Sequence, residues 1–445
     1  MSLPAIPNAI TRRDLLRAGA GASILSPLLA ACGASGSAPA VRPSGREDFS
    51  GVSLTAVFTP GTDPARHGIK AALNAWSART HGKVNTISLT FADIPVKYAG
   101  YLASADDSVD VLYAWQGLVG QFADRLYADL THRVSAADFS PATIRAMTVN
   151  GKLYAVPIHS ETAFFIYNKD YFSAAGLDPD HPPATWQELF DAAPRLRKGN
   201  RSANATALFG PGENLAWFLA FLNSTPTHLL SPDLRHATFG NHDGLAAFQA
   251  IDDGLSSGFF DHAALTTAGT EFDTIKLFSA GTTASMCNFA QLWAVATDPK
   301  QSKVSGSVGA SIMPGIYPGA SGSINGYEGF GVSKFSRQQD AALSLVNELT
   351  SARFEKVANL SDKFPPSRLS VLNDPQVRSS YPIATLLEKQ GRYNTSRYGA
   401  PYYDRMEQLF SKVLASMWKG KITPMQALDQ SSTQLQQIID SFYHS

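Results

Sequence analysis

Acidic, amide and aromatic side chains follow two of the strands that the sequence predicts near its N-terminal end. Asp63 comes after the first predicted strand, and Trp115 and Gln116 come after the third. Carboxylate and amide groups bond to hydroxyl groups at the edge of a small polar ring, whereas an aromatic plane covers its apolar face. These side chains therefore suit the binding of a neutral, hydroxylated ligand.

The sequence lacks the usual motifs of catalytic and metal sites. It contains no C-x-x-C, H-E-x-x-H or G-x-S-x-G motif, and its 10 histidines are scattered. A hydrolase acting on sugars would need two converging carboxylates, one of them with a raised pKa. The pairs Asp106–Asp107 and Asp252–Asp253 are neighbours in sequence, so their side chains point in different directions. We therefore expect a binding protein without enzyme activity, cofactor or metal. The alternative function, from a different class, is that of an exported glycoside hydrolase.

The composition is that of an ordinary globular protein. The chain has 445 residues, 44% of them apolar and 17% charged, which is long enough for two or three domains. Its 37 basic and 37 acidic residues balance, which argues against a nucleic acid or another polyanion as partner. Cys287 lies in an apolar run and is the only cysteine besides Cys32, so we expect a buried thiol and no disulfide in the mature chain.

Hydrophobic periodicity predicts strands that alternate with helices near the N-terminus. Residues 52–58, 84–90 and 109–114 read as strands, and residues 64–80 and 96–102 read as helices. In the first helix Ile69, Ala72, Leu73 and Trp76 form an apolar stripe on one face. This order predicts an α/β fold with a parallel, doubly wound sheet, whose ligands bind beyond the carboxyl ends of the strands. The loops that hold Asp63 and Trp115 lie at such ends.

The stretch from residue 152 to residue 186 has a different pattern. Two short apolar runs, 153–157 and 163–167, read as separate strands with the polar gap 159–162 between them. A short helix then ends at Gly176, and Thr185 with Glu188 forms a T-x-x-E capping box for the next helix. Further on, a strand is predicted from Thr206 to Phe209, before a turn and a helix.

The run PIHSETAFFIYNKDYFSAAGLDPDHPPATWQEL resembles a segment of the extracellular solute-binding proteins that feed ATP-binding-cassette importers, above all the carbohydrate-binding branch. The segments around residues 325–334 and 364–368 resemble two further parts of that family. The resemblance implies a type II periplasmic-binding-protein-like fold, in which two α/β lobes are joined by three crossings and hold the ligand between them. The first crossing would lie within residues 152–186, the second near Tyr327 and the third near Pro365. Lobe 1 would comprise residues 51–158 and 327–364, and lobe 2 residues 162–325 and 366–445.

The same resemblance implies a set of ligand-binding side chains. In the family an aromatic residue after the strand at 284–289 lies against the sugar, which points to Trp293. The family's glycine is missing there, so Asn288 and Gln291 are rivals. Our candidates for the ligand's edges are Asp63, Gln116, Ser160, Glu161, Asn288, Glu328 and Arg397, and those for its faces are Trp115, Trp217, Trp293, Tyr327 and Tyr398.

The N-terminus reads as an export signal. Arg12–Arg13 resembles a twin-arginine motif, and the apolar stretch 18–31 is too short to span a bilayer. The sequence Leu-Ala-Ala-Cys ending at Cys32 resembles a lipobox, which implies a signal peptide over 1–31 and acyl chains on Cys32. Residues 32–50 would then be a lipidated tether to the outer face of the cytoplasmic membrane. An ordinary secretory signal with a chance cysteine is the alternative.

The function expected from these features is that of a lipid-anchored, monomeric binding component of an importer. It would capture a sugar, a disaccharide or an amino sugar and deliver it to the permease subunits. Amino sugars are among the candidate ligands because Glu161 and Glu328 could pair with an ammonium group. Within the binding class, glycerophosphodiesters are the competing ligands.

Overall fold

The computed structural model describes residues 48–444, except 92, 200, 205–213, 261–270, 394 and 396. The predicted signal peptide, Cys32 and most of the predicted tether lie outside these residues, and so does the strand predicted from Thr206 to Phe209. Among the described helices, none combines the length and the apolar character needed to cross a membrane.

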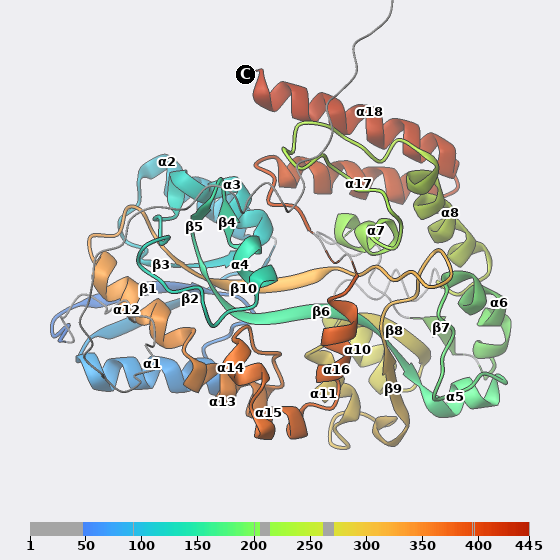
Figure 1. Cartoon of the computed structure of the whole chain (residues 1–445), viewed down its shortest axis with the longest axis horizontal. Coiled ribbons are helices and arrows are strands. Elements are labelled where there is room, and N and C mark those ends of the chain that lie inside the picture. The colour runs from blue at the N-terminus through green and yellow to red at the C-terminus, as the bar shows by residue number, and fades with distance from the viewer. Residues whose placement is uncertain are drawn as a thin grey trace, which may run out of the picture. The chain divides into compact units, whose positions relative to one another are not determined.

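One mixed sheet of eight strands runs through the structure (Figure 1). Its order is β2 (Lys83–Ser88), β1 (Ser53–Phe58), β3 (Val111–Trp115), β10 (Asn325–Val332), β6 (Val156–Asn168), β8 (Thr283–Phe289) and β7 (Ser202–Asn204), with β9 (Val308–Ser311) also pairing with β6. The strands β2, β1 and β3 are parallel, as the sequence predicts, whereas β10 and β6 are antiparallel to their neighbours. A small hairpin joins β4 (Thr148–Val149) and β5 (Lys152–Leu153).

The prediction of two short strands separated by a polar gap at 159–162 is wrong. Residues 156–168 form the single 13-residue strand β6. The polar residues belong to it because β10 pairs alongside, with Thr162 opposite Asn325 and Glu161 opposite Gly326. Backbone pairing on a neighbouring strand thus outweighs the low strand propensity of the polar side chains.

The first core lies on the part of the sheet formed by β1, β2 and β3. It is covered by α1 (His67–Thr80), α2 (Ile94–Ser104), α3 (Gln116–Leu126), α4 (Pro141–Ala146), α12 (Gln339–Leu349) and α13 (Ala352–Asp362). The predicted stripe on α1 is confirmed, because Ile69, Ala72 and Trp76 are buried there. The Trp76 Nε1–H donates to Ser344 Oγ on α12 at 3.1 Å, which satisfies the polar atom of this ring.

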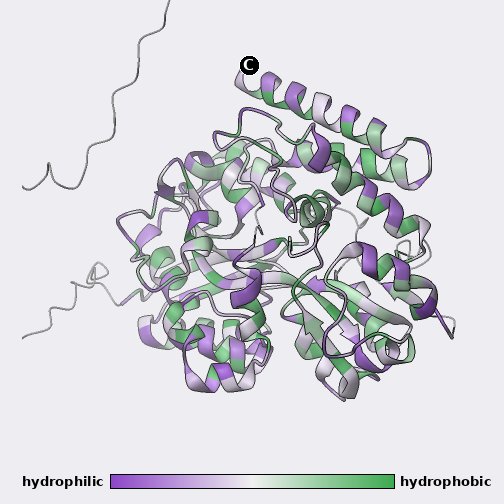
Figure 2. Cartoon of the chain, turned by 45° about the vertical axis from the view of Figure 1, so that its right-hand side comes forward, coloured by the Kyte–Doolittle hydropathy of each residue, from purple (hydrophilic) through white to green (hydrophobic). Residues whose placement is uncertain are grey.

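The second core lies beyond the other half of β6. It contains α5 (Lys169–Ala174), α6 (Trp186–Leu196), α7 (Asn214–Leu222), α8 (His242–Ser256), α17 (Tyr403–Trp418) and α18 (Pro424–Tyr443). The capping box of Thr185 and Glu188 is confirmed at the start of α6, and Thr423 caps α18 in the same way with Gln426. Along α18, hydrophilic and hydrophobic residues alternate in bands, as expected of a helix with one buried face (Figure 2).

A third, smaller core lies on the opposite face of β6 from the second. Phe164 and Ile166 point into it, whereas Phe165 and Tyr167 point into the second core. The elements around it are α10 (Glu271–Ser279), α11 (Leu292–Thr297), the short 3-10 helix η2 (Ser305–Ser307) and α16 (Ala384–Gln390). The helices α14 (Leu369–Leu372) and α15 (Pro375–Ser380) pack against α13. Cys287 is buried in the second core, as predicted.

Candidate functional site

Trp115 lies where the first and second cores meet. It is half-buried at the end of β3 and packs against both cores. The Tyr403 ring meets it edge-on, with ring centres 5.0 Å apart, and Arg397 Cζ lies 5.4 Å from its ring centre. Because Trp115 contacts both cores, its environment depends on the distance between them.

Polar groups lie next to this aromatic contact. Asn325 Nδ2 donates to Gln116 Oε1 at 3.5 Å, which links the start of β10 to the start of α3. The Asn325 N–H donates to Thr395 O at 2.9 Å, so the chain before α17 is fixed to the same strand. Burial raises the pKa of Tyr327, which keeps its hydroxyl protonated and able to act as a hydrogen-bond donor.

A second group of polar side chains surrounds Glu328 on β10. His159 Nε2 lies 3.1 Å from Glu328 Oε2, and both side chains are largely buried. The backbone of Gly61 is close to the same carboxylate, since a Cβ atom at Gly61 would stand 3.2 Å from Oε2. Burial, with the Glu328 carboxylate beside it, raises the pKa of Tyr113 well above its usual value. The loop that holds Gly61 and Asp63 therefore lies close to Glu328 on β10.

Asp63 takes part in the turn that shapes the first of these loops. Its Oδ1 accepts the N–H of Ala65 at 2.7 Å, and the Thr59 N–H donates to Thr62 Oγ1 at 3.0 Å. Arg66, at the N-cap of α1, donates to Pro60 O and places its Cζ 4.8 Å from the ring centre of Phe364. On Phe364 the His159 ring also stacks, at 4.8 Å between ring centres and 25° between planes.

Glu161 lies deeper, on β6 beside the third core. It is 3% exposed and stands opposite Gly326, whose lack of a side chain leaves room for it. Burial, together with the nearby Glu161 carboxylate, raises the pKa of Tyr381 well above its usual value. The carboxylate therefore lies near the phenol of Tyr381, a residue that also lines the cavity described next.

A cavity of about 950 Å³ opens between the first and third cores. Arg66 and the end of α13 line one side of it, whereas α10, α11 and Tyr381 line the other. Trp293 and its rival Gln291 are both in the lining. The rim carries three basic side chains, Arg66, Lys276 and Lys363, and two acidic ones, Asp298 and Asp362. This volume lies in the range of pockets that enclose small molecules.

Four other predicted residues serve the framework in this structure. Trp217 is 2% exposed and packs in the second core. Asn288 Nδ2 donates to Thr274 Oγ1 at 2.6 Å, and Ser160 Oγ donates to Pro366 O at 2.8 Å. The Tyr398 hydroxyl accepts the N–H of Leu229 at 2.9 Å.

Several residues of this region were not predicted from the sequence. Arg66, Phe364 and Tyr381 line the cavity or stack beside it. Arg66 had one available signal, because it lies three positions after Asp63 on the same loop. Phe364 had another, since it precedes a Pro-Pro pair in a predicted crossing.

The sequence matches a known protein family over most of its length. The model of bacterial extracellular solute-binding proteins matches residues 63–356, about two thirds of the chain. The chain belongs to this family. It is thus a solute-binding component of an ABC transporter and not an enzyme.

Known relatives agree with this assignment. A probable ABC transporter-binding protein of Deinococcus radiodurans is 26% identical over 391 residues, which make up 83% of this chain and 90% of the relative. The sn-glycerol-3-phosphate-binding periplasmic protein UgpB of Escherichia coli K12 is 51% identical over 47 residues, 11% of each chain.

Solved structures of sugar-binding proteins share the fold. Maltose-bound MalE3 of T. maritima superposes with a TM-score of 0.77 at 22% identity, covering 86% of this chain and 99% of that one. The cyclic alpha-maltosyl-1,6-maltose binding protein of Arthrobacter globiformis gives 0.71 at 22% identity, over 88% and 99% of the chains. At such identities, the likeness establishes the architecture alone.

Proposed function

We propose that this solute-binding protein captures a sugar or polyol in the cavity between its first and third cores and hands it to the permease of an ABC importer. The observation that carries the proposal is the cavity itself, which combines the aromatic plane of Trp293 with the amide of Gln291 and the phenol of Tyr381. Aromatic planes suit the C–H faces of a sugar, and amide and hydroxyl groups suit its edge. Several proteins of the same fold carry sugars or polyols, including tagatose and ribitol.

Capture would proceed by closure of two lobes. We propose the lobes expected from the sequence, residues 51–158 with 327–364 and residues 162–325 with 366–445. Closure would change the surroundings of the candidate residues that lie where the two lobes meet, which are Trp115, Gln116, Tyr327, Glu328 and Arg397. A ligand that touches both lobes only when they are closed shifts the hinge equilibrium toward that state. The permease would then recognise the closed form, and Cys32 would carry the lipid anchor.

The charged side chains at the cavity rim support a phosphorylated polyol as the second candidate ligand. Arg66, Lys276 and Lys363 outnumber Asp298 and Asp362. The Asp362 carboxylate is also held by its own side of the cleft, since it accepts the Gly68 N–H at 3.0 Å and lies 2.8 Å from His67 Nδ1. A rim with excess positive charge suits a phosphate group. Glycerophosphodiesters therefore belong in the same screen as sugars.

The test is a thermal-shift screen of the mature protein against monosaccharides, disaccharides, amino sugars, polyols and glycerophosphodiesters. Isothermal titration would follow for each compound that raises Tm. We expect at least one sugar or polyol to bind with a dissociation constant in the micromolar range or below. A response to glycerophosphodiesters alone would replace the sugar by the second candidate, and no response to any of these classes would refute both.

A further inference from the structure

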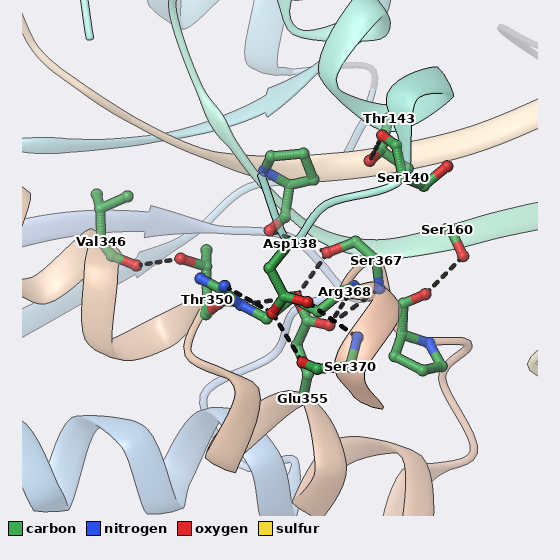
Figure 3. Close-up of polar contacts among 12 residues, drawn as sticks. Asp138, Ser140, Thr143, Ser160, Val346, Thr350, Glu355, Ser367, Arg368 and Ser370 are labelled. Atoms are coloured by element: carbon green, nitrogen blue, oxygen red, sulfur yellow. Dashed lines mark hydrogen bonds and ion pairs between the residues drawn. The ribbon is translucent and has the colours of Figure 1, made fainter. Parts of the chain in front are cut away.

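The segment from Phe364 to Arg368 is tied to β6 at the point where that strand passes between the cores. The Ser160 N–H donates to Pro365 O at 2.9 Å, and Ser160 Oγ donates to Pro366 O at 2.8 Å. Ser367 Oγ lies 3.3 Å from Pro157 O. Figure 3 shows Ser160 and Ser367 reaching toward one another's segments. Two of the three proposed crossings are thus in direct contact.

This segment cannot hold its own shape through backbone donors. Pro365 and Pro366 have no N–H group, so they offer carbonyl acceptors only. The next two N–H groups, of Ser367 and Arg368, both donate to Glu355 Oε2, at 3.0 and 2.9 Å. Ser367 Oγ donates to Oε1 of the same carboxyl group at 2.6 Å. One side chain of α13 therefore fixes the geometry that presents both proline carbonyls to Ser160.

Glu355 does this from full burial. Its side chain is 0% exposed, and the Arg368 Nε atom lies 4.0 Å from Oε1. The guanidinium bonds elsewhere, because Nε–H donates to Thr350 O at 2.7 Å and Nη1–H donates to Asp138 Oδ2 at 3.3 Å. In Figure 3 the Glu355 carboxyl group stands between Ser367 and Arg368. Its role is accordingly to accept three hydrogen bonds from the segment.

We propose that Glu355 is a positioning residue that joins the first and third crossings into one hinge, and so sets ligand affinity without touching the ligand. Ser160 is the link, because it precedes Glu161 on β6 and takes its contacts from the segment that Glu355 holds. Loss of these contacts would let the two crossings bend independently, and the closed state would become less favourable. This inference rests on the proposed capture by lobe closure.

The experiment compares three variants for ligand affinity and for amide hydrogen exchange. Glu355→Ala removes the acceptor, whereas Glu355→Gln keeps one oxygen for the two N–H groups. Phe354→Leu is the matched control, because it lies on the same helix and loosens the first core. We expect Glu355→Ala to weaken binding tenfold or more and to speed exchange at the Ser160 amide at least tenfold. Glu355→Gln should stay within about threefold of wild type, and Phe354→Leu within about twofold.

The outcomes separate this inference from the proposed function. Unchanged Ser160 exchange in Glu355→Ala, or equal loss of affinity in Phe354→Leu, would overturn the hinge role of Glu355. If the wild-type protein binds nothing in the screen, the proposed function fails, but the exchange of Ser160 still decides whether Glu355 fixes the crossings. Should Glu355→Ala not fold, Ser367→Ala replaces it, since it deletes the hydroxyl bond to Oε1 and the contact with Pro157 O but keeps both N–H donors to Oε2. Unchanged exchange of Ser160 in that variant counts against the proposal.

Discussion

The contact between Gly120 and Gly399 gives the sharpest test of closure between the two proposed lobes, because it joins the first core to the second. Gly120 lies on α3 of the first core, and Gly399 precedes α17 of the second. A Cβ atom at Gly120 would stand 2.2 Å from both the carbonyl carbon and the oxygen of Gly399, where ordinary contact begins near 3.4 Å. The Gly120→Ala variant must therefore separate the two backbones by about 1.2 Å, the difference between these distances.

The expected cost follows from the size of this clash. Forcing an extra methyl group into a well-packed contact costs about 1–3 kcal/mol. If only the closed form contains the contact, this cost appears entirely in ligand binding, as a loss of affinity of about 5- to 150-fold. The ligand-free protein would then keep its Tm within about 2 °C, because the open form relieves the clash.

The matched control is Gly399→Ala at the same contact. Its Cβ atom would stand 3.4 Å from Gln116 O and 3.8 Å from Gly120 Cα, which is ordinary packing distance. We expect this variant to bind within about twofold of wild type. Isothermal titration with the tightest ligand of the screen and thermal unfolding without ligand are the measurements. A lower Tm for Gly120→Ala with unchanged affinity would refute the reasoning, since it would mean that both forms share the contact.

Three further predictions follow from the site. Trp293→Ala should lower ligand affinity by about 5- to 30-fold, because a half-buried plane in the cavity lining is lost, with Tm within about 2 °C; titration that finds equal affinity would remove this ring from the site. Trp217→Ala should destabilise the fold by about 3–5 kcal/mol in urea titration, because this ring is 2% exposed, and lost binding in a fully stable variant would contradict that packing role. Burial raises the pKa of Glu355 from 4.5 to about 8, so the folded state holds this proton more tightly than the unfolded chain and loses stability as pH rises from 4.5 to 8. The Glu355→Gln variant lacks this titration, so its free energy of unfolding should rise relative to that of the wild type by up to about 5 kcal/mol over that pH range. Parallel pH profiles of the free energy of unfolding for the two proteins would contradict this prediction.

The regular elements near the N-terminus could be predicted from the sequence because their own residues determine them. The stripe of Ile69, Ala72 and Trp76 on α1 and the capping box at Thr185 depend on local spacing, and both are confirmed. The polar stretch at 159–162 could not be predicted in this way. Its strand is formed by pairing with β10, which lies more than 160 positions away in the chain and leaves no local signal.

The site residues show a similar division. The loops after β1 and β3 do come close to Glu328 and Arg397, because carboxyl ends of parallel strands gather at one edge. The burial of Trp217 could not be predicted from its own helix, because α7 is apolar on every side and its residue spacing does not distinguish one face from another. The partners of Phe364 come from two distant segments, so no pattern in the sequence links it to His159 and Arg66.

The position of β10 in the sheet has a consequence for how the chain folds. In the sheet order, β10 lies between β3 and β6, so the part of the sheet formed by β1, β2 and β3 is joined to β6 only when residues 325–332 are available. Most of the second core precedes β10 in the chain. Formation of the first core therefore depends on the pairing of β3 with β10, which are far apart in the sequence, and such pairing is a slow step in folding. A fragment ending before residue 325 leaves β3 and β6 with unpaired edges toward each other, and such edges promote aggregation.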